Sequence, residues 1–344
     1  MAVSFDLLKR LGSGNFGEVW RAIDIGLDSE CAVKIIPKDK VINQSNFYSE
    51  AQTLKIAEHP NIVKVLDTGS MSDGRIYVKM EYLKNGSLED EAEGAYVKLS
   101  RVKKLMIDVL RALEYSHSKN IIHRDIKPAN ILIGDASEGK LSDFGLALPR
   151  ITTLDLSYIK KYQYILHLAP EVTSFEKFSV QSDIYACGAT MYRLVNGDGF
   201  IPNIPITDIR AKTLDGTFPD RSSYRFFIPR SFRLLINKAL NINENKRYQS
   251  ALEMRHALEK LTVAVDWDER KIQNGIRWYS LKGNINISIS LFVGTNKKWN
   301  VRFRKGRDIK NLRQYNSVSL YHTSKTKAEK YAKKLLQDYV NGNA

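Results

Sequence analysis

The chain has 344 residues, of which 43% are hydrophobic and 26% charged, and its formal net charge is +15. This length exceeds what one hydrophobic core usually serves and indicates two or three lobes, and the composition is typical of a globular protein. No apolar run approaches about eighteen residues, and MAVSFDLLKRLGSG lacks a basic segment followed by an apolar one. We therefore predict neither a membrane-spanning helix nor a secretory signal.

The positive charge is concentrated at the C-terminal end. Residues 263–344 contain 17 Lys and Arg against 6 Asp and Glu, a net charge of +11, which leaves +4 for residues 1–262. We predict two units of different electrostatic character, joined near residue 263. A strongly basic surface favours acidic partners.

Only two cysteines occur, Cys31 and Cys187, and both lie inside apolar patterns. Neither a disulfide framework nor a metal site is expected from them. This usage favours a reducing, cytoplasmic location.

Residues 5–80 are predicted to form a small, strand-rich lobe. FDLLKRLGSGNFGEVWRAID and CAVKIIP are apolar stretches punctuated by glycine, as strands joined by a tight loop are. NFYSEAQTLKIAEH interrupts them with helical spacing, and NIVKVLDTG and RIYVKMEYL return to strand.

After a hinge expected at residues 81–87, the pattern becomes helical. RSFRLLINKAL and YQSALEMRHALEKL each predict a helix. Two longer helices are predicted from apolar stripes, which comprise Val102, Leu105, Val109, Leu110 and Leu113 in one and Ile184, Cys187, Gly188, Met191, Leu194 and Val195 in the other. The fold class is therefore α+β, with an N-lobe over about 1–80 and a C-lobe over 88–262.

GSGNFGEV places Gly12, Gly14 and Gly17 between two predicted strands, where backbone amides can approach a polyphosphate closely. A dinucleotide-binding loop needs a helix directly after the glycines, whereas EVWRAID continues as a strand. A plain β-turn is the other interpretation of these glycines.

Lys34 lies in the apolar stretch AVKII and is expected to point inward, where it needs an anion. Glu50, on the following helix, is the candidate partner. The alternative is a surface lysine whose stem alone is buried.

The segment IIHRDIKPANILI sets polar residues between two short β-branched runs. It supplies Asp125 and Asn130, and LSDFGLA supplies Asp143. A carboxylate and an amide oxygen brought together can bind Mg²⁺, whose shell substrate phosphates complete. Asp125 is then free to accept a hydroxyl proton, and Lys127 can neutralise charge on a moving phosphoryl group.

Together these motifs resemble those of Hanks-type serine/threonine protein kinases, over roughly residues 5–262. GSGNFGEV, AVK, HRDIKPAN, DFG and APE follow the family's order, and SDIYACGATMYRLVNG looks like its central helix. The segments DIKPANIL and RYQSALEM resemble the sequences of bacterial members of the family. The resemblance implies a bilobal kinase fold, ATP and Mg²⁺ as cofactors, and serine or threonine hydroxyls of protein substrates as acceptors.

The resemblance also implies roles for single residues. Asp125 is the base, Lys127 assists it, and Lys34 grips the ATP phosphates while paired with Glu50. Asn130 and Asp143 hold Mg²⁺. The ATP site comprises Gly12, Gly14, Gly17, Val19, Ala32, Lys34, the gatekeeper Met80, the backbone of Glu81 and Leu83, and Leu132. Supporting roles fall to Asp183, which anchors the catalytic-loop backbone, to the pair Arg247–Glu171, and to a stack of Leu54, Val65, His123 and Phe144.

The match weakens between Phe144 and Ala169. Where the family usually has Gly-Thr, this chain has Gln163 and Tyr164, which leaves the choice of acceptor open. A pseudokinase that serves as a scaffold or nucleotide sensor is the competing interpretation. The intact set of Lys34, Asp125, Asn130 and Asp143 favours catalysis over it.

Arg124 directly precedes Asp125, and in the family an arginine there often pairs with a phosphate on the activation segment. We hypothesise autophosphorylation on Thr152 or Thr153. An ordinary polar loop is the alternative.

Residues 263–344 are predicted to form a basic α+β domain. NINISISLFVG alternates strictly, KWNVRFRKGR follows it, and DERKIQNGIRWYSL suggests one earlier strand. SKTKAEKYAKKLLQDYV predicts a closing helix. We expect three or four strands with one packed helix.

The surface of this domain suits a polyanion, since it includes Arg302, Arg304, Lys305, Arg307, Lys310 and Arg313. Its element order weakly resembles small nucleic-acid-binding modules such as the arm-binding domain of phage integrases. The alternative is docking of protein, either an acidic partner or the kinase lobe itself. No membrane partner is expected, and the sequence does not indicate an oligomeric state.

Overall fold

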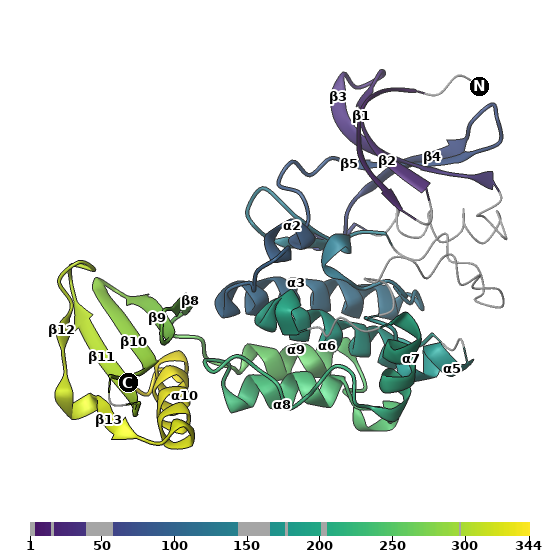
Figure 1. The fold of residues 1–344 in the computed structure, drawn as a ribbon. Coiled ribbons are helices and arrows are strands. Elements are labelled where there is room, and N and C mark those ends of the chain that lie inside the picture. Colours follow the sequence, from purple (N-terminus) through teal and green to yellow (C-terminus); the bar gives the residue numbers. More distant parts are fainter. Residues whose placement is uncertain are drawn as a thin grey trace.

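The computed structural model describes residues 4–14, 17–38, 58–143, 166–175, 178–200, 205–295 and 297–344. Three parts follow one another along the chain (Figure 1): an N-terminal sheet, a helical lobe, and a C-terminal sheet with one helix. This order is the α+β arrangement expected from the sequence.

The N-terminal sheet is antiparallel, with strand order β1-β2-β3-β5-β4. Its strands are β1 (Phe5–Gly14), β2 (Gly17–Asp24), β3 (Ser29–Ile36), β4 (Val65–Ser70) and β5 (Ile76–Glu81). Alternation explains the packing of β3: Cys31, Val33 and Ile35 turn to one buried cluster, and Ala32 and Ile36 to the other. The helix predicted over NFYSEAQTLKIAEH lies almost wholly outside the described residues.

The helical lobe begins after the hinge. Its helices are α2 (Leu88–Ala92), α3 (Leu99–Ser118), α5 (Pro170–Phe175), α6 (Val180–Asn196), α7 (Ile206–Asp215), α8 (Arg230–Ala239) and α9 (Ala251–Glu259). Between α3 and α5 lie the 3₁₀ turn η2 (Pro128–Asn130) and the hairpin of β6 (Ile131–Ile133) and β7 (Gly139–Leu141). Two more 3₁₀ turns are η5 (Asp198–Phe200) and η6 (Glu244–Lys246).

The four predicted helices of this lobe are confirmed as α3, α6, α8 and α9. Helix α6 is more buried than its stripe indicated, because every residue from Ser182 to Asn196 is buried. It begins where the Ser179 side chain accepts the N–H of Ser182, an N-cap bond that fixes its first turn. A helix buried on all sides is a firm base for a neighbouring site.

Residues 263–344, here called the C-terminal module, form a sheet of order β12-β11-β10-β9-β8, with β13 also paired to β11. Its elements are β8 (Asp268–Ile272), β9 (Gly275–Lys282), β10 (Ile285–Val293), β11 (Trp299–Gly306), β12 (Arg313–Gln314), η7 (Asn316–Val318), β13 (Leu320–Thr323) and α10 (Lys325–Asn341). The predicted count of three or four strands was wrong, since the sheet has six. The segment taken as one earlier strand is the hairpin β8–β9, which turns at Gln273 and Asn274.

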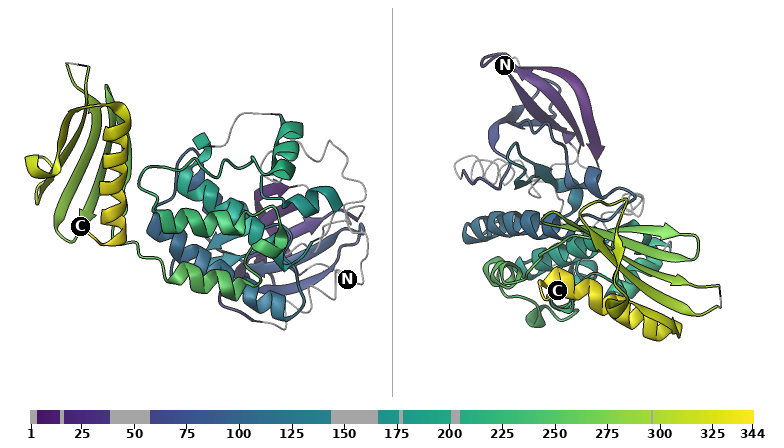
Figure 2. Two further views of the ribbon diagram at one scale, coloured as in Figure 1. Left: turned by 90° about the horizontal axis from the view of Figure 1, so that it is seen from below. Right: turned by 90° about the vertical axis from the view of Figure 1, so that its left-hand side faces the viewer.

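Helix α10 covers one face of the module's sheet (Figure 2). The alternating residues of β10 and β11 explain this, because Ile287, Ile289, Leu291, Val301 and Phe303 are all buried. The ring of Phe303 stacks on that of Tyr339 of α10, with centroids 5.9 Å apart.

The module packs against the helical lobe, at the other end of the molecule from the N-terminal sheet (Figures 1 and 2). The Tyr96 hydroxyl donates to the carbonyl oxygen of Trp267 at 2.8 Å and accepts the N–H of Glu269 at 2.7 Å. The Glu269 carboxylate binds Arg225 of the lobe at 2.6 Å and the indole N–H of Trp278 at 2.8 Å. The Phe226 ring stacks on Trp278, with centroids 5.8 Å apart.

Among the described helices, none has the length and apolar composition that crossing a membrane requires. Cys31 and Cys187 are both buried and form no disulfide.

Candidate active site

The polar segment singled out in the sequence runs between α3 and β6 and is hydrogen-bonded to helix α6. One carboxylate oxygen of Asp183 accepts the backbone N–H of His123 at 2.8 Å, and the other accepts that of Arg124 at 2.9 Å. Arg124 has a left-handed φ of 73°, a conformation that costs a non-glycine residue about 1–3 kcal/mol unless its surroundings impose it. The predicted anchoring of this backbone by Asp183 is confirmed.

His123 is fully buried and joins this segment to the end of β7. Its Nδ1 accepts the backbone N–H of Asp125 at 3.2 Å, and its Nε2 donates to the carbonyl oxygen of Ser142 at 2.9 Å. Burial lowers the pKa of His123, against the opposing effect of the carboxylates Asp183 and Asp125. The neutral, Nε2-protonated ring therefore fits both bonds.

Asp125, Lys127 and Asn130 form one contact group. The Lys127 ammonium lies 2.8 Å from Oδ2 of Asp125, and the Asn130 side-chain amide donates to the same oxygen at 2.9 Å. The same amide also donates to the backbone carbonyl of Asp125 at 2.7 Å. The turn η2 places Asn130 back over Asp125, so the five-residue spacing becomes a direct contact.

Lys34 reaches across from β3 to the residue after β7. Its Nζ lies 2.9 Å from Oδ1 of Asp143. Burial works against ionisation of Asp143, but the charge and hydrogen bond of Lys34 outweigh it, and its pKa falls below the ordinary value. Glu50, the expected partner of Lys34, lies outside the described residues.

These two groups are linked through the backbone. The N–H of Ser142, the residue before Asp143, donates to the carbonyl oxygen of Asn130 at 2.9 Å. The charge of Lys127 also lowers the pKa of Asp143. Five of the six predicted polar site residues, all except Glu50, are thus brought together between the N-terminal sheet and the helical lobe.

The oxygens of this group suit a magnesium ion. Asn130 turns its amide nitrogen to Asp125, which leaves its Oδ1 without a bond to any described residue. Asp143 uses only Oδ1 for Lys34. An ionised carboxylate and an amide oxygen are ligands that Mg²⁺ accepts, with further oxygens from a phosphate or water.

The predicted adenine-contacting residues are linked by strand register. Val19 of β2 pairs with Lys34 of β3, and Ala32 of β3 pairs with Met80 of β5. Leu132 of β6 is bridged to Ser87 at the end of the hinge. Val19 and Leu132 both pack against the apolar cluster that contains Ala32 and Met80.

Of the two predicted site glycines Gly12 and Gly17, Gly17 occupies a position that excludes any other residue. Its φ is +130°, and a Cβ there would lie 2.0 Å from the carbonyl oxygen of Ile35. At Gly12, by contrast, a Cβ would meet no described atom within 4 Å. Gly14 pairs directly with Gly17, at the facing ends of β1 and β2.

Some backbone groups of the hinge already form hydrogen bonds within the protein, and others do not. The N–H of Glu81 donates to the carbonyl of Lys64 at 3.0 Å, so only its carbonyl remains for a ligand. Both carboxylate oxygens of Glu81 bind Lys140 of β7, at 2.8 and 2.9 Å. The N–H of Leu83 makes no hydrogen bond with a described residue.

The sequence profile described as "Protein kinase domain" matches residues 5–260. The chain belongs to the protein kinase family. The serine/threonine-protein kinase PknB of Mycobacterium leprae is 33% identical over 264 residues, covering 73% of this chain and 42% of that protein. PrkC of Bacillus subtilis is 30% identical over 255 residues, covering 73% and 39%. The CBL-interacting serine/threonine-protein kinase 20 of Arabidopsis thaliana is 28% identical over 257 residues, covering 71% and 55%.

The chain therefore spans about two fifths of the length of the bacterial kinases it resembles. The profile ends at residue 260, so the C-terminal module is not part of the matched kinase domain.

A second anchor of the kinase lobe was also predicted. Arg247 forms a two-pronged ion pair with Glu171, with nitrogen–oxygen distances of 2.7 and 2.8 Å. The Arg247 side chain is fully buried and donates to three further backbone carbonyls. This predicted pair is confirmed, and it ties the APE segment to the end of the lobe.

Of the predicted hydrophobic stack, Val65 and His123 are buried, whereas Leu54 and Phe144 lie outside the described residues. Thr152, Thr153, Gln163 and Tyr164 also lie outside them. Their expected roles remain predictions.

Two supporting residues were missed by sequence reasoning. His117, at the end of α3, lies 2.9 Å from Asp183 through its Nε2. Lys140 binds both carboxylate oxygens of Glu81. The sequence shows that His117 lies shortly before the HRD segment, but this spacing did not indicate a role for it.

Proposed function

We propose that the chain transfers the γ-phosphoryl group of ATP to serine or threonine hydroxyls of protein substrates, its own included. The observation that carries this proposal is the joint placement of Asp125, Lys127 and Asn130 against the Lys34–Asp143 pair. It is also supported by the bacterial relatives, which are named serine/threonine-protein kinases.

Asp125 is the proposed general base. Its Oδ1 has no hydrogen bond to a described residue and can accept the proton of a substrate hydroxyl. The hydroxyl oxygen then bonds to the γ-phosphorus as the bond from that phosphorus to the bridging oxygen breaks. The ADP oxygen carries the departing electron pair.

Lys127 and Lys34 are the proposed cationic groups. Lys127, 2.8 Å from Asp125, lies where charge is proposed to develop on the moving phosphoryl group. Lys34 lies on the strand beside the glycine turn and is proposed to grip phosphate oxygens. Glu50 is retained as its proposed second partner.

We propose that ATP binds against the predicted adenine-contacting residues described above, with Met80 as gatekeeper. The Glu81 carbonyl and the Leu83 N–H are the backbone groups proposed to contact adenine. Asn130 and Asp143 are the proposed ligands of Mg²⁺. When bound, that ion neutralises phosphate charge and orients the phosphate for in-line attack.

The test is transfer of labelled phosphate from ATP to a mixture of serine- and threonine-containing peptides and to the chain itself. Asp125→Asn should lower the rate by about 10²–10⁴-fold, because it removes the base. Asp135→Asn, at a side chain 78% exposed in the β6–β7 turn, is the matched control and should leave the rate unchanged. Equal rates for wild type and Asp125→Asn would refute the proposal.

The second candidate is a pseudokinase that only senses nucleotide. The departure at Gln163 and Tyr164 favours it. Magnesium-ATP would then raise the unfolding temperature of wild type and Asp125→Asn alike, with no transfer by either. Tyrosine phosphorylation in place of serine or threonine would show that Tyr164 changes the acceptor.

We also propose the division of the chain into a kinase domain at 1–262 and a basic module at 263–344, and a reducing, cytoplasmic location. The buried, unpaired cysteines support the location. For the module we propose an acidic macromolecule as partner; the sequence left protein and nucleic acid open.

A further inference from the structure

The uncovered face of the module's sheet carries arginines in one row across four strands. Strand register pairs Arg270 of β8 with Arg277 of β9, Arg277 with Ser290 of β10, and Ser290 with Arg302 of β11. Paired residues in antiparallel strands point to the same face. Since Trp278 and Ile289 of the neighbouring row are buried on the α10 side, this row points away from α10.

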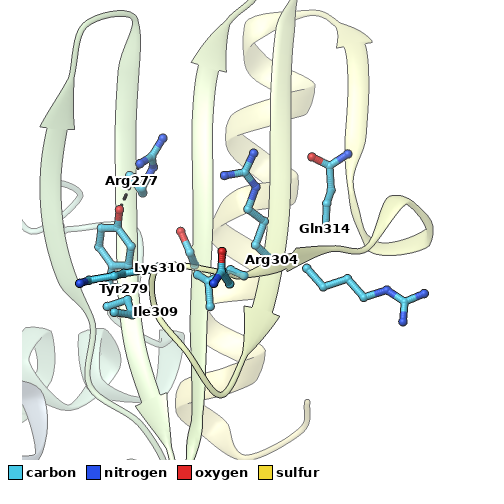
Figure 3. Close-up of a pocket in the computed structure, with 10 residues that line it drawn as sticks. Arg277, Tyr279, Arg304, Ile309, Lys310 and Gln314 are labelled. Atoms are coloured by element: carbon cyan, nitrogen blue, oxygen red, sulfur yellow. Dashed lines mark hydrogen bonds between the residues drawn. The ribbon is translucent and has the colours of Figure 1, made fainter.

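The next row on the same face adds a fourth arginine, mostly among neutral hydrogen-bonding groups. It runs from Asp268 of β8 through Tyr279 of β9, Ser288 of β10 and Arg304 of β11 to Gln314 of β12. Figure 3 shows Arg277, Tyr279, Arg304 and Gln314 on this face, with α10 behind the sheet. We call Arg270, Arg277, Arg302 and Arg304 the arginine face.

The one carboxylate in these two rows, that of Asp268, lies 3.7 Å from the ammonium of Lys98 and forms no ion pair with the arginines. Among the described residues, none of the four arginines forms an ion pair, and Arg277 bonds only to the hydroxyls of Ser290 and Tyr279, at 3.0 and 3.1 Å. Asp308, the acidic residue of the β11–β12 loop, accepts the N–H of Lys310 and the amide of Asn311. Like charges directly opposite on neighbouring strands destabilise a sheet, so the arrangement costs folding free energy and calls for an external anion.

Two further features support an anionic partner for the arginine face. Burial and the charges of Arg302 and Arg277 lower the pKa of Arg304, which shows that the guanidinium groups repel one another. The Nε of Arg302 is buried without a hydrogen bond to any described residue.

The face is shallow and broad. Ser288 and Ser290 of the middle strand are 3% and 5% exposed and form its floor. A pocket of about 560 Å³ opens above this floor, bounded by Arg277, Arg304 and the β11–β12 loop with Ile309 and Lys310 (Figure 3). The strands β9, β10 and β11 together span about 10 Å, close to the width of about 12 Å of the major groove of B-form DNA.

We propose that the arginine face binds double-stranded DNA, with the sheet lying in the major groove. Arginine pairs with phosphates and with guanine edges in a two-pronged manner, and Ser and Gln side chains suit other base edges. An acidic peptide would not require these interleaved neutral groups. Double-stranded RNA is disfavoured, because its major groove is too deep and narrow for side chains to read.

The test uses the full chain and a labelled duplex of about 20 base pairs, titrated by fluorescence anisotropy between about 50 and 200 mM salt. We expect a Kd of about 10⁻⁶–10⁻⁴ M for mixed sequence, weakening with salt. The triple variant Arg277→Gln, Arg302→Gln, Arg304→Gln should reduce the slope of log K against log salt by about 2.7, or 0.9 for each lost contact.

The matched control is Lys327→Gln, Lys330→Gln, Lys334→Gln, which removes the same charge from exposed positions of α10. It should leave the slope unchanged. The arginine triple should unfold at the same temperature as wild type or higher, because repulsion is relieved. If it fails to fold, Arg302→Gln alone should still reduce the slope by about 0.9.

Equal losses in both triples would overturn the proposal, as would no binding to DNA at the lowest salt. Tighter binding of double-stranded RNA or of polyglutamate than of DNA would overturn it as well. Asp125→Asn should bind DNA as wild type does, so failure here is distinct from failure of the proposed kinase activity.

Discussion

The carboxylate of Asp183 accepts the backbone N–H of His123 at 2.8 Å, and through this bond the central helix α6 holds the segment that carries Asp125. The other oxygen of Asp183 accepts the N–H of Arg124, whose left-handed backbone would otherwise be strained. The position of the proposed base is therefore set by a residue about sixty positions later in the chain.

Asp183→Asn should lower both stability and phosphoryl transfer. An amide offers one acceptor and sets an N–H against a buried backbone N–H, which costs about 1–3 kcal/mol. Urea unfolding and labelled-phosphate transfer measure the two effects. Asp28→Asn is the control, because Asp28 is exposed and asparagine tolerates its φ of 45°. A variant as active and as stable as wild type would contradict the anchoring role.

Gly17→Ala should raise the KM for ATP. The new Cβ would lie 2.0 Å from the Ile35 carbonyl oxygen, so the β1–β2 turn must move. Strain of about 1–3 kcal/mol corresponds to roughly 5- to 150-fold in kcat/KM. Gly26→Ala, where a Cβ would make an ordinary contact of 3.5 Å, should change little. Similar kinetics for the two variants would show that the turn is adaptable.

Tyr96→Phe should loosen the C-terminal module. The change leaves the N–H of Glu269 and the carbonyl of Trp267 without their partner, at a cost of about 1–3 kcal/mol. Burial raises the pKa of Tyr96 to about 12, so the hydroxyl keeps its proton throughout the neutral range. Limited proteolysis between residues 260 and 268 should become faster. Tyr115→Phe, whose hydroxyl bonds to no described residue, is the control and should be cut like wild type.

Stability should fall as pH drops below about 6.5, because the pKa of His123 is lower in the folded chain than in the unfolded one. Between these two pKa values the unfolded chain binds the extra proton, so the contribution is complete above pH 6.5 and is lost during acidification. The slope attributable to His123 is at most about 1.4 kcal/mol per pH unit.

This pH dependence is measured by urea unfolding from pH 7.5 downward, in wild type and His123→Gln. Burial also lowers the pKa of His59, which adds an effect of the same sign, so the difference between the two proteins isolates His123. His322→Asn, at an exposed position, should keep the wild-type slope. Identical slopes for His123→Gln and wild type would contradict the assignment.

Autophosphorylation on Thr152 or Thr153 should raise activity through Arg124. The Nε of Arg124 is buried without a hydrogen bond to a described residue, and a phosphate would supply charge-assisted bonds. Arg124→Gln and the double change Thr152→Ala, Thr153→Ala should each lower the rate about tenfold or more. Arg230→Gln, at an exposed position, is the control. Mass spectrometry that finds this segment unmodified in fully active protein would refute the hypothesis.

Local chemistry was easier to predict than pairing at the sheet edges. Stripes such as Val102, Leu105 and Val109 marked α3 because core packing repeats with the helical period. Strand β8, Asp268–Ile272, has four polar residues in five and becomes a strand only through its pairing with β9. The Asn274-Gly275 dipeptide beside its turn was the signal that could have revealed this hairpin, which we predicted as one strand.

Contacts between distant segments were beyond sequence reasoning. The Asp143 partner of Lys34 lies 109 positions away, and no local pattern states it. The docking of Trp267 and Glu269 on Tyr96 and Arg225 depends on folded surfaces that meet only after both parts have formed. The family resemblance supplied the first relationship in outline and was silent on the second.

Hydrogen bonds hold the segment that joins the kinase lobe to the C-terminal module. The N–H of Ala264 bonds to the carbonyl of Val340 at 2.8 Å, and the indole of Trp267 bonds to that of Leu336 at 3.1 Å, so the connecting segment is fastened along α10. Because Tyr96 and Arg225 of the kinase lobe also bond to this part of the module, any molecule bound by the module would lie at a fixed distance and orientation from the proposed catalytic site. Substrates of the kinase domain would then be selected by whether their acceptor hydroxyl lies at the distance and angle that this geometry allows.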